Sequence, residues 1–324
     1  MKPETDKPDQ PCGEERFAAG FFRKNATIQI VPTQEARLNQ TLPYQLVAFD
    51  LDNTTLYRGE LSRANRSALA ALKRKGVVTV AATGRHISLM PHFIRHSRHI
   101  DYILCVTGAS LYDVKTREMR YLCSLSADTA KIAVEICKHI GGRMNLVTRE
   151  RALAERAAFQ SFVKSPQVKG HSRSKPSLKQ MLHLLRMMTA SKLMDDAAAY
   201  LDEQPLVNVE KMDAFFDDDA QTHEAVRLLQ ESGHFEVAVS PRYLEITAKG
   251  CTKGTGLARL YEILGLTKAD AIAFGDSGND LSMADHASLF VAMGNAEPAV
   301  LARAGKIAPD VRADGFAAVI AELF

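Results

Sequence analysis

The most informative segment of this chain reads Leu46-Val47-Ala48-Phe49-Asp50-Leu51-Asp52-Asn53-Thr54-Thr55-Leu56. Its apolar start predicts a buried parallel strand, and Asp50 and Asp52 follow at the end of that strand. Two carboxylates so close together repel each other when they are buried, so the pair predicts a hard metal cation between them. The alternative is a strand that ends in a solvated turn, which is the commoner origin of a short Asp-x-Asp pattern. The rest of the chain distinguishes the two interpretations.

Three more segments place polar residues directly after a short apolar strand or at the start of a helix. They are Thr83, Gly84 and Arg85 after the strand 77–82, Lys253 ahead of the helix 256–264, and Asp276, Asn279 and Asp280 after the strand 271–274. A hydroxyl, a glycine and a helix N-terminus suit a phosphate group, and further carboxylates suit a metal ion. Each segment is weak evidence alone, because turns, surface lysines and acidic loops are common. Their order along the chain and their shared place at strand ends favour one functional site.

Together these segments resemble the motifs of the haloacid dehalogenase-like (HAD) phosphatase superfamily. The chain is similar to the Cof-type branch of that superfamily, whose members carry a large class IIB cap between the second and third motifs. The likeness covers residues 45–324 and includes shorter matches at 106–113, 243–246, 253–254 and 292–296. These motifs are specific for the family, but they do not identify a substrate.

Two positions depart from the family pattern. Asn53 stands where glycine is usual, and asparagine tolerates a left-handed backbone well enough for the turn to survive. Thr107 stands where many relatives carry asparagine, so we expect it either to weaken a hydrogen bond at the edge of the core or to contact the cap. Neither change alters a residue that is expected to carry the chemistry.

The expected fold is α/β, with a doubly wound parallel-sheet (Rossmann-like) HAD core and an inserted α+β cap domain. Alternating strands and helices support this fold class. Residues 1–42 are polar and proline-rich at their start and are expected to form a disordered extension. The core is expected to comprise residues 43–123 and 247–324, and residues 124–246, called the insert below, would form the cap that selects the substrate.

The resemblance implies a role for each motif residue. Asp50 corresponds to the nucleophile, and Asp52 corresponds to the acid that protonates the leaving group and to the base that activates water. Mg²⁺ is the implied cofactor, held by the Asp50 carboxylate, the Asp52 backbone carbonyl and the Asp276 carboxylate. Asp280 would orient the water molecules of the ion from a second shell. The phosphate would be bound by the backbone amides of Leu51 and Gly84 and by the side chains of Thr83, Lys253 and Asn279.

The implied function is a Mg²⁺-dependent phosphatase that hydrolyses small phosphorylated metabolites, such as sugar phosphates or phosphorylated cofactors, through an aspartyl-phosphate. A phosphotransferase or phosphomutase acting on sugar phosphates is an alternative, because the same core could hand the phosphoryl group to a sugar hydroxyl. A non-catalytic phospho-aspartate switch is disfavoured. A slowly hydrolysing switch should lack the acid and base that Asp52 provides, and it has no use for a large cap.

Composition agrees with a protein that handles small molecules. The chain has 324 residues, is 46% hydrophobic and carries a formal net charge of +3, so nothing in it calls for a nucleic-acid or membrane partner. No apolar run approaches the length needed to span a membrane. The five cysteines lack the spacing of metal ligands and are expected to be reduced, mostly buried thiols in a cytoplasmic monomer or homodimer.

Two clusters of basic or histidine residues allow a second interpretation. His92, His96 and His99 could share one face of a helix as metal ligands, but no carboxylate or cysteine recurs at matching spacing, so a solvated face is favoured. The other cluster is expected to be a surface loop of the cap, and the alternative is that one of its cations reaches over the active site and holds an anionic part of the substrate. Its members are Lys164, Lys169, Arg173, Lys175 and Lys179.

Overall fold

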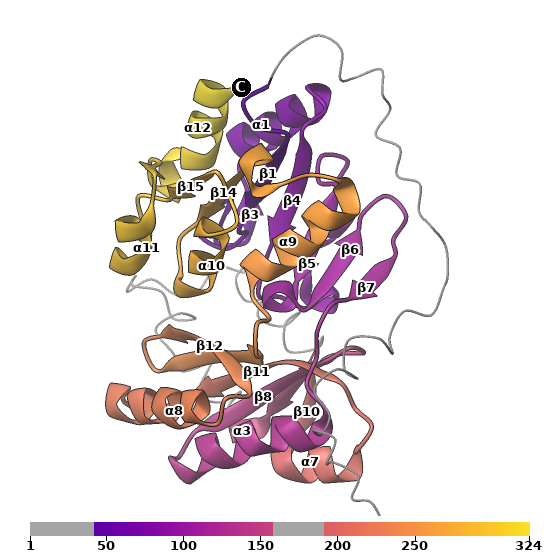
Figure 1. The fold of residues 1–324 in the computed structure, drawn as a ribbon, viewed down its shortest axis with the longest axis vertical. Coiled ribbons are helices and arrows are strands. Elements are labelled where there is room, and N and C mark those ends of the chain that lie inside the picture. Colours follow the sequence, from indigo (N-terminus) through magenta and orange to yellow (C-terminus); the bar gives the residue numbers. More distant parts are fainter. Residues whose placement is uncertain (1–41, 158–190) are drawn as a thin grey trace, which may run out of the picture. The chain divides into compact units, whose positions relative to one another are not determined.

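The computed structural model describes residues 42–157 and 191–324, which form two large β-sheets, a short hairpin and the helices packed against them (Figure 1). The expected N-terminal extension, apart from Leu42, and the basic cluster between Lys164 and Lys179 lie outside the described residues.

The larger sheet has the strand order β16-β15-β14-β1-β4-β5-β6-β7. Its parallel strands are β1 (Leu46–Phe49), β4 (Val78–Ala82), β5 (Tyr102–Cys105), β14 (Ala271–Gly275), β15 (Leu289–Ala292) and β16 (Lys306–Ile307). Two antiparallel strands, β6 (Ser110–Asp113) and β7 (Met119–Tyr121), extend the sheet beyond β5. Because β1 pairs with both β14 and β4, the carboxyl ends of these three strands meet at one edge. The polar segments that follow them are therefore brought together.

Apolar residues explain why β1 lies in the middle of the sheet. All four of its residues are completely buried. Below the sheet edge, the ring of Phe316 packs 5.3 Å from Phe49 and 4.9 Å from Phe274, measured between ring centroids. An apolar run without alternation is typical of a parallel strand covered on both faces, as the sequence predicts.

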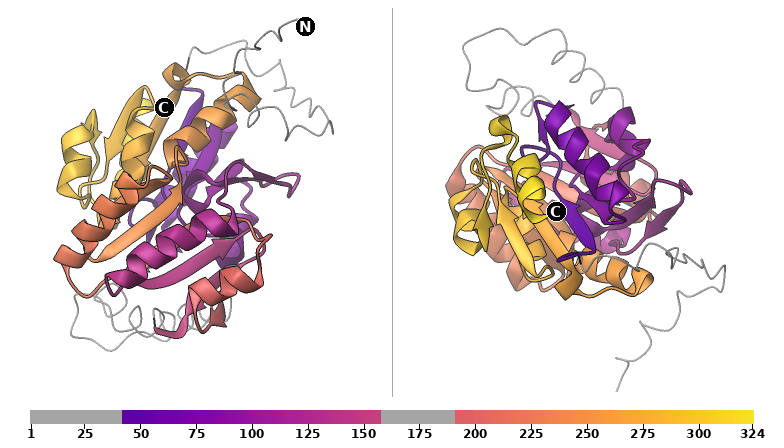
Figure 2. Two further views of the ribbon diagram at one scale, coloured as in Figure 1. Left: turned by 60° about the horizontal axis from the view of Figure 1, so that its bottom comes forward. Right: turned by 90° about the horizontal axis from the view of Figure 1, so that it is seen from above.

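Helices cover both faces of this sheet (Figure 2). They are α1 (Arg63–Arg74), α2 (His92–Arg95), α9 (Lys253–Leu264), α10 (Leu281–Ala284), α11 (Pro298–Arg303) and α12 (Gly315–Leu323). α1 contacts α12, whereas α9 contacts α10. The hairpin of β2 (Leu56–Tyr57) and β3 (Glu60–Leu61) lies between β1 and α1 in the chain. This arrangement confirms the predicted α/β fold with a doubly wound parallel sheet.

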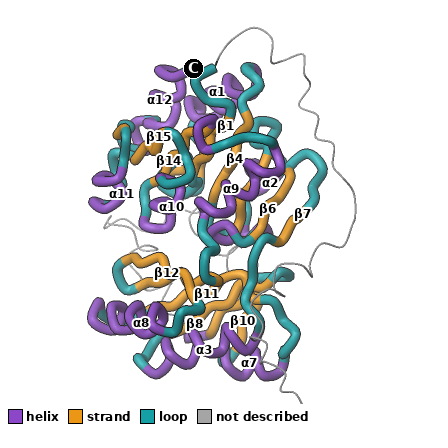
Figure 3. The backbone as a smooth tube through the Cα atoms, in the orientation of Figure 1, coloured by secondary structure: helices purple, strands orange, loops and turns teal. Residues whose placement is uncertain are grey.

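The second sheet has the strand order β10-β9-β8-β11-β13-β12 and is mainly antiparallel. Its strands are β8 (Arg143–Thr148), β9 (Ala152–Glu155), β10 (Ser191–Met194), β11 (Val209–Phe215), β12 (Phe235–Ser240) and β13 (Tyr243–Ala248). Three helices pack on one of its faces (Figure 3): α3 (Ala127–His139), α7 (Ala197–Glu203) and α8 (Asp219–Glu231). The side chains on the face that the helices cover therefore differ from those on the opposite face.

The central strand β11 shows this difference. Met212 and Ala214 belong to the hydrophobic cluster under the helices. Since successive side chains of a strand point to opposite faces, Lys211, Asp213 and Phe215 lie on the other face, where they line a cavity. Lys211 and Asp213 therefore belong to a site and not to a solvated surface.

One expected strand begins later than the sequence suggests. The sequence predicts a strand over residues 107–112, at the end of the first core segment, but the strand β6 starts at Ser110. Val106 and Thr107 have φ angles of 51° and 55° and form a 3₁₀ turn with Gly108, whose φ is 101°. The turn allows the backbone of Gly108 to approach Thr252, where an added Cβ would lie 2.0 Å from the carbonyl oxygen.

The expectation that all cysteines are reduced thiols is wrong for two of them. Cys123 and Cys251 form a disulfide, with their Cα atoms 6.4 Å apart. Cys105 and Cys137 are buried free thiols, as expected, and Cys12 lies outside the described residues. The bonded pair is 128 residues apart in the chain, so spacing gave no sign of it. Across the described part of the chain, no helix is both long and apolar enough to span a membrane.

Candidate active site

Three buried carboxylates meet at the carboxyl edge of the larger sheet. Asp50 follows β1 and Asp276 follows β14, and they are 6% and 8% exposed. Asp280, which is fully buried, comes from the 3₁₀ turn after β14. One carboxylate oxygen from each of the three lies within 4.8 Å of the others. The structure thus brings together the carboxylates that the sequence assigned to the nucleophile and to the metal site.

Lys253 is the cation of this cluster. It is the first residue of α9, whose start is fixed by reciprocal hydrogen bonds between Thr252 and Thr255. Its side chain is completely buried, and its Nζ lies 2.7 Å from Asp50 Oδ1 and 2.6 Å from Asp280 Oδ1. Asp280 is fixed in turn because its Oδ2 accepts hydrogen bonds from the backbone N–H groups of Asp276 and Ser277, at 2.9 and 3.1 Å.

The charges of this cluster do not balance. Burial raises the pKa of Asp50 well above its ordinary value, and although Lys253 acts against the rise, Asp280 and Asp276 add to it. Burial and the neighbouring Asp280 raise the pKa of Asp276 to about 7, against the hydrogen bond that Thr54 donates at 2.7 Å. Three carboxylates face one ammonium, so positive charge is lacking. A hard divalent cation with oxygen ligands fits this set of residues.

The predicted phosphate-binding residues lie around the same point. Thr83, at the end of β4, is buried, and its hydroxyl accepts a hydrogen bond from the backbone N–H of Arg85 at 3.2 Å. Gly84 leaves no room for a side chain, because a Cβ would lie 2.9 Å from Glu245 Oε1. Asn279 donates to Glu245 Oε2 at 3.2 Å. The Leu51 side chain is buried in the core, so only its backbone could serve the phosphate.

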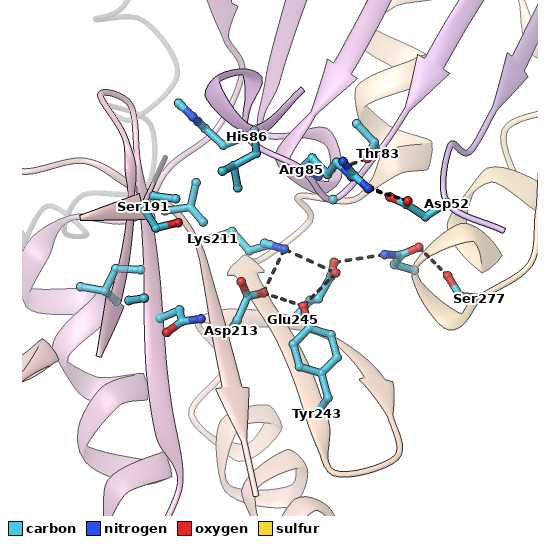
Figure 4. A pocket seen from close by; sticks show the side chains of 18 of the residues that line it. Asp52, Thr83, Arg85, His86, Ser191, Lys211, Asp213, Tyr243, Glu245 and Ser277 are labelled. Atoms are coloured by element: carbon cyan, nitrogen blue, oxygen red, sulfur yellow. Dashed lines mark hydrogen bonds and ion pairs between the residues drawn. The ribbon is translucent and has the colours of Figure 1, made fainter. Parts of the chain in front are cut away.

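Asp52 stands apart from the three buried carboxylates. Its side chain is 45% exposed, and Arg85 binds it with two hydrogen bonds, of 2.7 Å from Nε and 2.6 Å from Nη2 (Figure 4). Its carboxylate is therefore available at the rim of the site. Asn53, which follows it, has a φ of 59°, which confirms the expectation that asparagine takes the left-handed conformation of the turn.

A cavity of about 360 Å³ opens over these residues. Asp50, Asp52, Thr83, Gly84, Asp276 and Asn279 line it, whereas Lys253 and Asp280 are buried beneath and do not. The other wall carries polar groups from β8, β11 and β13, together with apolar ones such as Leu153 and Phe215. A cavity of this size suits a compact metabolite.

Charged residues of the second sheet form a network on that wall (Figure 4). Lys211 Nζ lies 2.9 Å from Asp213 Oδ1 and 3.4 Å from Glu245 Oε1. The Tyr243 hydroxyl lies 2.8 Å from Asp213 and 3.1 Å from Glu245. Burial alone would raise the pKa of Glu245, but Lys211 and a hydrogen bond from Thr107 lower it to about 2, so Glu245 is ionised.

The sequence assigned none of these residues to the site. Glu245 lies in a matched motif, 243–246, and Arg85 lies in the quoted Thr-Gly-Arg turn, but neither had a stated role. For Lys211 and Asp213 the signal was the alternation of charged and apolar residues along β11. Thr107 donates to Glu245 Oε2 at 2.6 Å, so of the two expectations for this residue the contact with the insert is the one observed.

The histidines do not form a comparable site. The rings of His92 and His96 stack with centroids 4.3 Å apart, and His99 is only partly buried. Within residues 42–157 and 191–324, the group Asp50, Asp276 and Asp280 is the one cluster of three side chains able to hold a metal ion.

Sequence and structure comparisons agree with this site. A family model described as haloacid dehalogenase-like hydrolase matches residues 47–320. The Bacillus subtilis (strain 168) protein YxeH is 27% identical over 268 residues, which are 80% of this chain and 90% of YxeH. An HMP-PP phosphatase of Yersinia pseudotuberculosis is 27% identical over 259 residues, which are 79% of this chain and 85% of that enzyme.

A solved structure shows the same fold. The HAD subclass IIB sugar phosphatase BT4131 matches with a TM-score of 0.68 at 21% identity, over 86% of this chain and 98% of that one. The family match spans most of the sequence, and the relatives are named phosphatases. The chain therefore belongs to the haloacid dehalogenase-like hydrolases, as a phosphatase (a phosphoric monoester hydrolase) of the Cof-type branch.

Proposed function

We propose that this protein is a Mg²⁺-dependent phosphatase that hydrolyses small phosphorylated metabolites, sugar phosphates or phosphorylated cofactors, through an aspartyl-phosphate on Asp50. The observation that carries the proposal is the Asp50 carboxylate, which lies at the floor of the cavity and is held at 2.7 Å by the buried Lys253. A carboxylate that lines the cavity is accessible to a phosphate group that enters it.

Asp50 would attack phosphorus, forming an Asp50 O–P bond while the bond from phosphorus to the leaving oxygen breaks. Asp52, kept at the rim by Arg85, would give its proton to the leaving oxygen and then take a proton from the water that hydrolyses the intermediate. In the second step the water oxygen bonds to phosphorus as the Asp50 O–P bond breaks, which releases phosphate and restores the Asp50 carboxylate. Asp52 can serve both steps because giving its proton in the first step leaves it as the base for the second.

The remaining residues would position the phosphate group and neutralise its negative charge. Thr83, Asn279 and the backbone amides of Leu51 and Gly84 would hold the phosphate oxygens, and Lys253 would act on them from beneath the cavity, where it lies 2.7 Å from Asp50. Such positioning is most of what phosphoryl transfer requires. Mg²⁺, held by the carboxylates of Asp50 and Asp276 and the Asp52 backbone carbonyl, with Asp280 orienting its water molecules, would supply the missing positive charge.

We further propose that residues 43–123 and 247–324 act as the catalytic core and that the insert, 124–246, acts as the cap. In support, the strands β8 to β12 lie within the insert, and Lys211 and Asp213 from it line the cavity. A monomer or homodimer remains the proposed assembly. The cytoplasm remains the proposed compartment, although the Cys123–Cys251 disulfide is at odds with a reducing one.

The proposal is tested by phosphate release from a panel of phosphorylated metabolites and from p-nitrophenyl phosphate. We expect activity with Mg²⁺, loss of activity with a chelator, and a fall of roughly 10⁴-fold or more in Asp50→Asn. Asp217→Asn is the matched control, because this carboxylate is 72% exposed, pairs with Arg143 and does not line the cavity. Activity of Asp50→Asn within about tenfold of the wild type would exclude the covalent mechanism.

The same assay separates hydrolysis from transfer. A phosphotransferase or mutase would consume the donor without stoichiometric release of phosphate, and a new sugar phosphate would appear among the products. Equal amounts of alcohol and inorganic phosphate would exclude that alternative.

A further inference from the structure

Two polar side chains of the second sheet lie next to each other in the cavity. Asp213 of β11 and Asn145 of β8 are direct partners in the antiparallel register, and both line the cavity. Directly opposite residues on antiparallel strands place their side chains on the same face within contact of each other. Asp213 and Asn145 therefore form a pair, called the acceptor pair below.

The acceptor pair has unused hydrogen-bonding capacity. Glu245 has four donor groups around it, from Lys211, Tyr243, Thr107 and Asn279, which matches the capacity of a carboxylate. Among the described residues Asp213 has two, the Lys211 ammonium and the Tyr243 hydroxyl. Half of its capacity remains.

Asn145 also has an unused hydrogen-bond acceptor. Its Oδ1 atom is buried and has no hydrogen-bond partner among the described residues. A buried acceptor without a donor destabilises the folded protein by about 1–3 kcal/mol. A bound molecule that donates a hydrogen bond to this oxygen would remove that penalty, which makes the orphaned atom evidence for a ligand.

The charge of the wall selects against anions. Lys211 is flanked by two carboxylates, Asp213 and Glu245, so the formal charge of these three side chains is −1, while burial raises the pKa of Asp213 above its ordinary value. Arg85, the other described cation that lines the cavity, is engaged by Asp52. Burial lowers the pKa of His86, so its ring is neutral at pH 7. Of the described lining residues, none offers an unpaired positive charge to a second anionic group.

We propose that Asp213 and Asn145 bind the leaving group of the substrate, and that this group is neutral and carries hydroxyl or amino donors instead of a second phosphate or a carboxylate. The inference rests on the proposed phosphatase activity and concerns the other end of the same cavity. Donor groups of the ligand reach the acceptor pair, while apolar residues such as Leu153 and Phe215 contact its carbon skeleton. The phosphate itself stays with the core residues.

Three substrates separate this inference from the proposed function. p-Nitrophenyl phosphate has a leaving group without donors, a hexose monophosphate has a neutral leaving group rich in hydroxyls, and a hexose bisphosphate has a leaving group that is itself anionic. For the wild type we expect kcat/KM for the monophosphate to exceed that for the bisphosphate by at least about tenfold. Asp213→Asn should lower kcat/KM for the monophosphate by about 10–100-fold. Because the substitution removes a negative charge, the ratio of kcat/KM for the monophosphate to that for the bisphosphate should also decrease.

Matched variants keep the experiment decisive. Asn145→Ala should lower kcat/KM for the monophosphate by about 5–50-fold, a larger loss than for p-nitrophenyl phosphate, and it decides the question if Asp213→Asn fails to fold. Asp217→Asn, just beyond the end of β11, should change none of the three values. If the wild type hydrolyses none of the substrates, the proposed function fails. If it hydrolyses p-nitrophenyl phosphate but prefers the bisphosphate, or if neither variant changes the preference, the acceptor pair does not select the leaving group.

Discussion

At the scale of single residues, Asp52 is the side chain whose contribution to catalysis can be measured most cleanly apart from its contribution to the stability of the fold. It is half-exposed, and within the described part of the chain its carboxylate pairs with Arg85, so its replacement should leave the fold intact. Asp52→Asn keeps the shape but cannot give or take a proton, and we expect turnover to fall by about 10²–10⁴-fold. Steady-state phosphate release measures the effect, with Asp217→Asn as the control for losing an Arg-bound carboxylate. A loss below about fivefold would remove Asp52 from the proposed acid and base role.

Glu210 is a second residue with a measurable consequence. It is fully buried, and burial raises its pKa from an ordinary 4.5 to about 7, against the lowering effect of the Ser110 side chain. The folded state thus binds a proton that the unfolded chain has already lost. Its contribution to stability is complete below pH 4.5 and is lost as the pH rises through about 7.

Glu210→Gln should remove this pH dependence. The shift corresponds to about 3 kcal/mol, at about 1.4 kcal/mol for each pKa unit. Urea denaturation of the variant and the wild type at pH 5 and pH 8 gives the free energy of unfolding of each. The difference, variant minus wild type, should be larger at pH 8 than at pH 5 by about 3 kcal/mol. Glu236→Gln, on the partly exposed side of β12, is the control and should give parallel curves. Parallel curves for Glu210→Gln as well would show that Glu210 does not titrate in this range.

At the scale of elements, the contact between the turn Val106–Gly108 and the start of α9 holds Lys253 in place. Gly108 has a φ of 101°, and a Cβ on it would lie 2.0 Å from the Thr252 carbonyl oxygen. Gly108→Ala must therefore displace the first turn of α9. We expect the free energy of unfolding to fall by about 2–4 kcal/mol and kcat to fall with it.

Gly250→Ala provides the matched comparison for this prediction. Its φ of 72° is also left-handed, but nothing lies within 4 Å of the added Cβ, so only the backbone penalty of about 1–2 kcal/mol applies. Chemical denaturation and phosphate release on both variants separate the two effects. Equal losses for the two glycines would mean that the approach of Gly108 to α9 is not important.

At the scale of the whole molecule, the Cys123–Cys251 disulfide closes a loop that contains all six strands of the second sheet and the helices α3, α7 and α8. Closing a loop of this length restricts the unfolded chain and should stabilise the fold by about 2–5 kcal/mol. A dithiol reductant should therefore lower the urea midpoint of the wild type. The double variant Cys123→Ala with Cys251→Ala should start lower and be insensitive to the reductant.

Cys137→Ala is the control for this experiment, because its thiol is free. It should remain sensitive to the reductant. A wild type whose midpoint is the same with and without reductant would contradict a stabilising disulfide.

Local patterns were sufficient for the fold class and for the floor of the site. The unbroken apolar runs before Asp50 and Asp276 predicted buried parallel strands, and parallel strands necessarily present their carboxyl ends at one edge. Lys253 was found in the same way, because a helix start is marked by nearby residues such as Thr252. In each case the information lies within a few residues of the chain.

Only the tertiary structure revealed the other wall of the cavity, the buried Glu210 and the disulfide. Asp213 faces Asn145 because β11 pairs with β8 in one particular register, and Glu245 meets Thr107 across 138 residues of chain. A shift of one residue in that register would move the Asp213 side chain to the opposite face of the sheet, among the residues of the hydrophobic cluster. The residues of β11 alone do not specify which residues of β8 they pair with. Interactions between distant segments depend on how whole strands pair, and this pairing is settled by the packing of the complete sheet and not by any local stretch of sequence.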